Sequence, residues 1–399
     1  MSRIIIITGK GGVGKSSVAA AHAVKSAQEG VKTLLVSTDM AHNIADIFQI
    51  PVGGHVVPLM EHLYGLELDP DLMIKEEFPD MNRSIQAMFQ EAGLSAQKMG
   101  MDVTFPGFDD LFCLLKIGKM QESGEYERII VDCAPTGETL SLLKLPELLA
   151  WYMEKFFPVG KTMVRLLSPI SRVRYHVNLP SSEGMDDIGR MHRQLMHLQE
   201  LLKDDQICSV RLVATPEKMV VEETKRSFMY LNLYGYPVDG IFINRVLSDG
   251  LCNEFFEHWR EIQKNYIAEI ETVFAGLSIY KIPWLAEEIR GEKALAYMVD
   301  EMFDSIDEND FYAIHSHVDK ETYEKVEGGY LFRLQIPDLT QYQVEEDLLV
   351  ACHGMDLDIT LHNFKRRIPL PDLLYGASVE EVSVCGDGIE VYLKTGDKS

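Results

Sequence analysis

The 399-residue sequence predicts an α/β fold with a parallel sheet flanked by helices, a helical insert and a C-terminal all-β sandwich. Three observations support this prediction. Up to about residue 310, short apolar runs alternate with helical patterns, which is typical of a parallel sheet covered on both faces. A glycine loop follows the first apolar run directly. Beyond residue 326, short alternating strands are separated by glycine, proline and aspartate turns.

The first predicted strand covers residues 3–8, and residues 16–30 are expected to form a helix that Gly30 ends. The loop between them has the pattern G-x-x-x-x-G-K-[ST], which is typical of a P-loop NTPase. Such a loop presents backbone N–H groups and the positive end of a helix to phosphate. Lys15 is expected to reach the β- and γ-phosphates of ATP, and the Ser16 hydroxyl to bind Mg²⁺. The expected nucleotide-binding residues here are Gly9, Lys10, Gly11, Gly12, Val13, Gly14, Lys15, Ser16 and Ser17.

Four further apolar runs are expected to be buried strands, at residues 32–39, 126–137, 210–217 and 238–246. Ligands of such sheets bind beyond the carboxyl ends of the strands, so the polar strand ends should converge on one site. Asp132 is expected to hold the magnesium ion through water. Asp39 could orient the attacking water or cap the helix that follows it, and the two roles are compatible.

The character of the sequence changes between about residues 72 and 205, where helical periodicity is prominent on both sides of the run at 126–137 and where eleven of the nineteen methionines lie. Two amphipathic faces are predicted. They consist of Met81, Ile85, Met88, Phe89 and Ala92, and of Ile188, Met191, Leu195, Leu198 and Leu202. Such a region is either a helical subdomain with an ordinary core or an adaptable groove for apolar peptide.

The predicted domains are an ATPase domain at residues 1–310, an acidic linker at 311–325 and the sandwich at 326–399. The net charge of −24 argues against nucleic acid as a partner and against direct binding to an anionic membrane. No signal sequence is recognised, and no apolar run approaches the roughly 18 residues that would span a membrane, so a cytoplasmic location is expected. The six cysteines are scattered without a C-x-x-C pair, which favours core thiols.

Lys10 is a second lysine inside a loop that needs only one. A solvated loop residue would explain it. A catalytic residue that reaches into a facing active site and stabilises transition-state charge there, as an arginine finger does, would explain it better.

The segment "GKGGVGKSS" resembles the deviant Walker A loop of the MinD, ParA, nitrogenase-iron-protein and ArsA class. "STDMAHNIADIF" and "VDCAPTGETLSLLKLPE" are similar to the first and second switches of the ArsA and tail-anchored-protein-targeting (GET pathway) ATPases. "TPEKMVVEETKR", "FINRV" and "IPWLAEEIRG" are similar to further segments of the same family. MinD-type proteins lack the second switch motif. The matches extend over about residues 1–310.

The resemblance implies an ATPase that uses ATP and Mg²⁺, with Asp39, Lys10 and Lys15 as catalytic residues. It also implies nucleotide contacts by Asn43, Glu223, Asn244 and Pro283. Family members close as homodimers in which the lysine at the place of Lys10 crosses the interface. Their helical subdomains form a shared groove. The expected function is therefore a homodimeric targeting factor or chaperone that binds hydrophobic polypeptides, such as tail-anchored membrane proteins, and meets membranes only through clients or a receptor.

Three departures from the family bear on this expectation. The GET ATPases bind zinc at the dimer interface through a C-x-x-C pair, whereas the corresponding region here has only Cys252, so zinc is not expected. Arsenite-pump ATPases have two fused halves and a cysteine cluster, whereas this sequence has one such half and no cluster. A metalloid-pump subunit is therefore the alternative function and not the expected one. A MinD-like regulatory switch is a further alternative. The segments "FKRRIPLP" and "VSVCGDGIEVYLK" resemble the α-crystallin domain of small heat-shock proteins, which could bind clients, regulate the groove or do neither.

Overall fold

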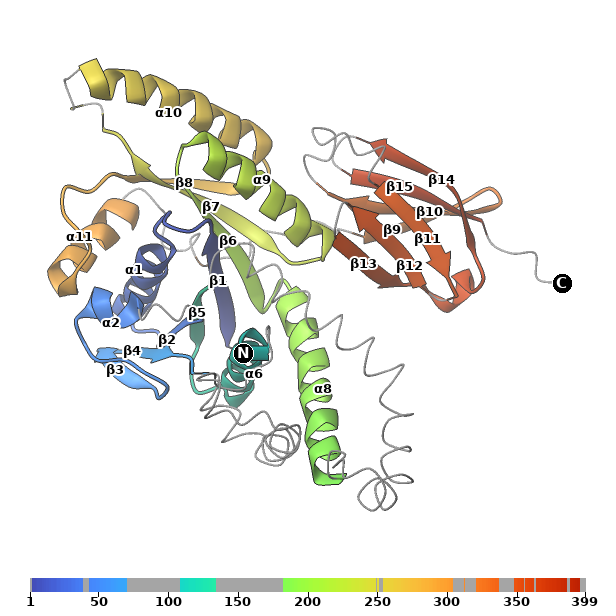
Figure 1. The fold of residues 1–399 in the computed structure, drawn as a ribbon, viewed down its shortest axis with the longest axis horizontal. Coiled ribbons are helices and arrows are strands. Elements are labelled where there is room, and N and C mark those ends of the chain that lie inside the picture. Colours follow the sequence, from blue (N-terminus) through green and yellow to red (C-terminus); the bar gives the residue numbers. More distant parts are fainter. Residues whose placement is uncertain are drawn as a thin grey trace, which may run out of the picture. The chain divides into compact units, whose positions relative to one another are not determined.

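The computed structural model describes a set of chain segments that divide into two compact units, drawn in Figure 1. The first unit comprises Met1–Cys208 with Ala286–Asp304, and the second comprises Ser209–Leu285 with Ser305–Ser399. The described residues are 2–38, 43–69, 108–133, 182–248, 250, 254–303, 312, 321–336, 348–354, 356–361, 364–385 and 388–394.

The first unit contains five strands in the order β3-β4-β2-β5-β1. They are β1 (Arg3–Gly9), β2 (Thr33–Ser37), β3 (Val57–Met60), β4 (Leu63–Glu67) and β5 (Arg128–Asp132). Strands β1, β5, β2 and β4 are parallel, whereas β3 pairs antiparallel to β4. Successive side chains of β1, β2 and β5 are buried, so these strands are covered on both faces. Burial on both faces explains why the sequences of these strands are continuous apolar runs.

The helices of the first unit are α1 (Lys15–Gln28), α2 (Asn43–Phe48), α6 (Phe108–Ser123), α8 (Ser182–Lys203) and α11 (Gly291–Phe303). Helix α1 packs against α11, and its alanines at 19, 20, 21 and 23 are fully buried. It ends as predicted, because Gly30 takes a φ of 81° that most residues avoid, and its N–H donates to the Ala27 carbonyl at 2.9 Å.

Helix α8 packs against α6 and confirms part of one predicted amphipathic face. Leu195, Leu198 and Leu202 are at most 1% exposed. A Cβ on Gly118 of α6 would lie 3.2 Å from Leu198 Cδ1, so glycine permits the close approach of the two helices. The side chains of Ile188 and Met191 and the whole face from Met81 to Ala92 lie outside what the structure describes.

The second unit contains three parallel strands in the order β6-β7-β8 and two long helices. These elements are β6 (Cys208–Ala214), α9 (Lys218–Leu233), β7 (Val238–Val246), α10 (Glu254–Val273) and β8 (Ser278–Pro283). A buried ion pair joins two of the strands: Arg211 Nε donates to Asp239 Oδ1 at 3.1 Å, and the two side chains are 1% and 3% exposed. Pairing removes the large penalty of burying either charge alone.

The C-terminal part of the second unit is a sandwich of two antiparallel sheets. One sheet has the order β14-β15-β10-β9, with β9 (Glu321–Val326), β10 (Gly329–Gln335), β14 (Ser378–Cys385) and β15 (Gly388–Lys394). The other has β11 (Leu348–His353), β12 (Asp356–Leu361) and β13 (Phe364–Pro369), followed by the 3-10 helix η2 (Asp372–Leu374). Strand β9 begins inside the predicted linker, because "ETYEKV" alternates charged and half-buried positions and lacks an apolar run.

The structure confirms the α/β class with helices around parallel strands and a C-terminal all-β part. The predicted domain boundaries, including the helical subdomain, remain predictions. Among the described residues, no helix combines the length and the apolar character that crossing a membrane requires.

Candidate nucleotide-binding site

The glycine loop connects the end of β1 to the start of α1, as the sequence predicts. Gly12 and Gly14 have φ values of 82° and 97°, a region that glycine enters without strain. Val13 between them is 2% exposed and fixes the loop to the core. Gly14 is the N-cap of α1 and provides no capping side chain, so the first turn of this helix has backbone N–H groups without a side-chain cap. Such an end of a helix favours phosphate.

The two loop lysines differ in their surroundings. Lys15 begins α1 and is only 7% exposed, and its Nζ donates a long hydrogen bond of 3.4 Å to the Lys10 carbonyl. The Lys15 side chain therefore lies along its own loop. Lys10 is partly exposed on the loop.

Asp132 is the last residue of β5 and is 1% exposed. In the sheet Asp132 lies opposite Ile7 of β1 and Ser37 of β2. It is therefore near the carboxyl ends of the strands, where the glycine loop begins. The chain around it is fixed by backbone hydrogen bonds, since Thr38 N–H donates to the Asp132 carbonyl at 3.0 Å and Cys133 N–H to the Ile7 carbonyl at 3.1 Å. A carboxylate at this position suits a hard cation such as Mg²⁺.

The predicted first switch meets the sheet at Glu67, a residue that the sequence analysis missed. Glu67 ends β4, is 3% exposed, and accepts hydrogen bonds of 3.1 Å from the backbone N–H groups of Ile44 and Ala45. It thereby holds the start of α2, where Asn43 lies. The rule that selected Asp132, a polar residue at the end of a buried strand, would also have found Glu67. Asp39 lies outside the described residues.

The residues that the resemblance assigns to the base and ribose all lie in the second unit. Asn244 and Pro283 lie near the carboxyl ends of the neighbouring strands β7 and β8, and Glu223 is in α9. Asn244 is 8% exposed, and its Oδ1 accepts from the N–H of Arg245 at 2.9 Å. Gln263 of α10 donates to the Arg245 carbonyl at 3.1 Å and so fixes this strand end. The contacts of these three residues with a nucleotide remain a prediction.

The first-unit arrangement fits magnesium-bound ATP. Loop N–H groups and the Lys15 ammonium would hold the phosphates, and the Ser16 hydroxyl and the Asp132 carboxylate would provide hard oxygen ligands, directly or through water. Within the described residues there is no group of three or more His, Cys, Asp or Glu side chains arranged to hold a metal. Cys252 lies outside them.

Comparison with known proteins gives two family matches and several relatives. Residues 2–304 match the family described as anion-transporting ATPase, and residues 327–393 match an HSP20-like domain found in ArsA. A putative arsenical pump-driving ATPase of Prosthecochloris vibrioformis is 33% identical over 379 residues, covering 94% of this chain and 91% of the relative. A protein of Aquifex aeolicus, named putative arsenical pump-driving ATPase 1, is 30% identical over 98% of this chain and 100% of its own length. The ATPase get3 of Pyrenophora tritici-repentis is 28% identical over 73% of this chain and 88% of its own length. The chain therefore belongs to the ArsA family of ATPases and hydrolyses ATP.

Proposed function

We propose that the chain acts as a homodimer that binds hydrophobic polypeptide segments, such as those of tail-anchored membrane proteins, and couples their capture and release to ATP hydrolysis. The observation that carries this proposal is the loop with two lysines. Lys15 lies along its own loop and is nearly buried, whereas Lys10 is partly exposed. Lys10 is thus the more exposed of the two loop lysines, which fits a lysine that acts in trans.

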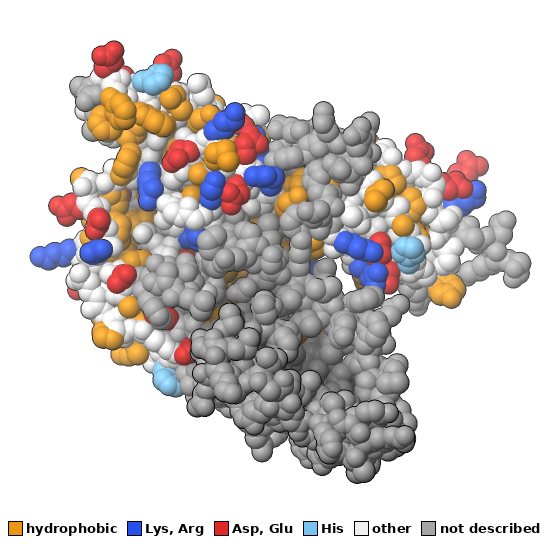
Figure 2. All heavy atoms as spheres, viewed as in Figure 1, with side chains coloured by type: hydrophobic (Ala, Val, Ile, Leu, Met, Phe, Trp, Pro, Cys, Tyr) orange, Lys and Arg blue, Asp and Glu red, His pale blue; other side chains and the backbone are white. Residues whose placement is uncertain are grey.

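Exposed aromatic side chains on α10 support the homodimer. Phe255 is 63% exposed and Trp259 is 39% exposed, and their ring centroids lie 6.4 Å apart. Figure 2 shows apolar side chains gathered over this helix. The buried residues of α10 begin only at Gln263, so the first two turns of the helix extend beyond the packed part of the unit. In the GET ATPases that this chain resembles, the corresponding segment lies at the dimer interface, and a second copy bound here would cover the aromatic rings.

The relatives carry two kinds of name, and each suggests a function. Two relatives named putative arsenical pump-driving ATPase extend over both family matches, which favours metalloid transport as the second candidate. The get3 relatives match over about three quarters of the chain. Measurements of ATPase activity separate the two candidates. Arsenite should stimulate the activity of a pump subunit only, and an apolar peptide should stimulate that of a polypeptide-binding factor only.

Co-purification tests the proposed function directly. Wild type and Asp39→Asn are each expressed with hydrophobic tail segments and with one apolar segment that is not a tail, and Lys15→Ala serves as the variant with weakened nucleotide binding. We expect Asp39→Asn to bind ATP, hydrolyse it slowly and retain more tail segment than the wild type. Recovery of neither kind of segment by any variant would contradict the proposal. Equal recovery of both would leave a general chaperone and exclude tail targeting.

A further inference from the structure

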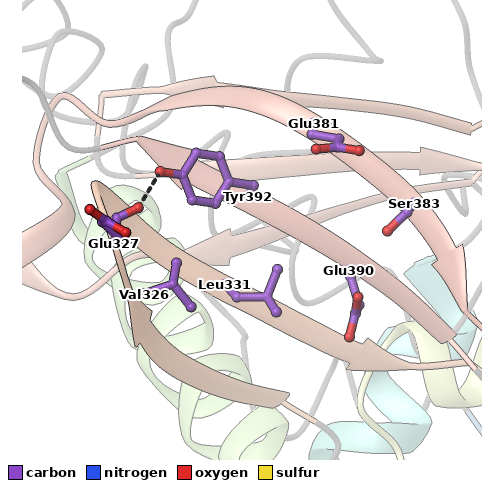
Figure 3. Close-up of a pocket in the computed structure, with 7 residues that line it drawn as sticks. All are labelled: Val326, Glu327, Leu331, Glu381, Ser383, Glu390 and Tyr392. Carbon is purple, nitrogen blue, oxygen red and sulfur yellow. Dashed lines mark hydrogen bonds between the residues drawn. The ribbon is translucent and has the colours of Figure 1, made fainter.

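The outer face of the four-stranded sheet of the sandwich carries a hollow of about 460 Å³. Figure 3 shows its lining residues, which come from strands β9, β10, β15 and β14 and, in the case of Glu327, from the turn between β9 and β10. These residues are Val326, Glu327, Leu331, Glu381, Ser383, Glu390 and Tyr392. The inward positions of the same strands, such as Phe332 and Val391, are fully buried, so the hollow is on the face that points away from the sandwich core.

The floor of the hollow is apolar. Leu331 and Tyr392 face each other in neighbouring strands, and Val326 lies beside them. The Tyr392 hydroxyl donates to the Glu327 carbonyl at 2.9 Å, which fixes the ring over the sheet. An aromatic ring held beside aliphatic side chains offers a surface for an aliphatic stem, and the face of the ring also attracts a cation.

The wall of the hollow is acidic, since three of the seven lining residues are glutamates and none of the seven is basic. The negative charge of Glu390 is already balanced, because its carboxylate accepts a hydrogen bond of 2.6 Å from Arg333. That bond holds the pKa of Glu390 below the usual range. Within the part of the chain that the structure describes, no ion pair joins the side chain of Glu327 or Glu381 to a basic residue. Their charges are available to a ligand.

We propose that this hollow binds a lysine or arginine side chain of the captured polypeptide, at the basic flank of its apolar segment. The aliphatic stem of the basic residue lies on Leu331 and Tyr392, and its charged head meets Glu327 and Glu381. Apolar membrane segments are commonly flanked by Lys and Arg, so the class of client in the proposed function has this chemistry. The inference rests on the proposed function because it assigns the sandwich a share of client recognition.

Binding of two labelled peptides to the full chain in the presence of ATP tests the proposal. The peptides share one apolar segment, and their flanks contain either arginine and lysine or glutamine. We expect the basic peptide to bind about fivefold more tightly, as one or two partly exposed ion pairs would give. Raising the salt concentration should reduce this preference, because the charges are partly exposed and are screened.

Two variants with the same change in net charge locate the effect. Glu381→Gln removes a carboxylate from the hollow and should abolish most of the preference. Glu380→Gln is the matched control, since the preceding residue of β14 does not line the hollow and pairs with Lys394 at 2.5 Å instead. We expect it to keep the preference.

The outcomes separate the two proposals. If the wild type binds both peptides equally well, or if the two variants behave alike, the hollow does not recognise the basic flank. The proposed capture of apolar segments is then unaffected. If neither peptide is bound, the proposed function fails and the assignment of the hollow fails with it. Tyr392→Leu provides a second measurement, because loss of the ring should weaken only the basic peptide.

Discussion

Replacement of Arg366 by methionine should loosen the contact between the sandwich and α9. Arg366 lies on β13 with its side chain 6% exposed. Its guanidinium donates to the carbonyl of Leu233 at the end of α9 and to the carboxylate of Glu321 on β9. A Cβ on Gly235, which has a φ of 79°, would lie 3.1 Å from Arg366 Nη2, so glycine leaves room for the arginine. Methionine keeps the apolar stem and removes both hydrogen bonds.

The size of the effect follows from the burial of the two acceptors. A hydrogen bond from a charged group contributes about 1.5–3 kcal/mol when the acceptor is buried. The Glu321 side chain is 31% exposed, so water compensates part of that loss. We therefore expect the Arg366→Met substitution to lower the free energy of opening by about 3 kcal/mol in total.

Hydrogen exchange of the backbone amides in β13 and in residues 233–236 measures this free energy. Arg367→Met is the matched control, because Arg367 pairs with Asp358 inside its own sheet, at 2.8 Å, and Lys365 still neutralises Asp358 at 2.7 Å after the change. The control should lose about 1 kcal/mol or less. Equal losses in the two variants, or a loss below about 0.5 kcal/mol for Arg366→Met, would refute the reasoning.

Three further predictions concern the nucleotide site and the sandwich. Lys15→Ala should weaken ATP binding about a hundredfold, as calorimetric titration would measure, and unchanged affinity would remove Lys15 from the site. Glu67→Ala should slow ATP turnover and cost about 1–2 kcal/mol of stability, because the N–H groups at the start of α2 lose their acceptor. Glu67→Gln retains an oxygen that can accept from these groups and should recover most of the activity. Equal ATP turnover in the two variants would contradict this prediction. Burial raises the pKa of Asp358, but hydrogen bonds from Arg367 and Lys365 outweigh it and hold the pKa below its usual range. The stability that the charged Asp358 contributes is present above the pKa of the unfolded state and is lost as pH falls through the lower pKa of the folded state. Asp358→Asn should therefore reduce the fall in the free energy of unfolding between neutral and acid pH, as urea titrations at several pH values would measure. An equal fall in the variant and the wild type would contradict this prediction.

The sequence was sufficient for the elements whose local pattern has one explanation. The buried runs of β1, β2, β5, β6 and β7 are apolar at successive positions because both faces of their strands are covered. Helix α1 has a glycine loop at one end and Gly30 at the other, so both ends were predictable. The loop residues and Asp132 follow from the same pattern of strand ends.

Elements that depend on contacts far along the chain were missed. Strand β9 is predominantly polar and pairs with β10, so no local signal distinguishes it from a linker. Strand β3 is a short antiparallel edge strand that a prediction of parallel strands does not include. The strand-end rule could have selected Glu67, but its partners are N–H groups about twenty positions away in the sequence, and the partners of Arg366 lie in α9 and β9. Spacing within a motif does not contain such information.

Mixing two inactive variants tests most directly whether Lys10 acts across a dimer. Lys10→Ala keeps Asp39 in its own site, and Asp39→Asn provides an intact Lys10. In a mixed dimer, a lysine that acts in trans restores one of the two sites. Random exchange of equal amounts should therefore recover about a quarter of the wild-type ATP turnover. Neither variant alone should exceed a few per cent of that turnover. Recovery to about this level is the predicted result, and turnover in the mixture that stays at the level of the separate variants would contradict the account.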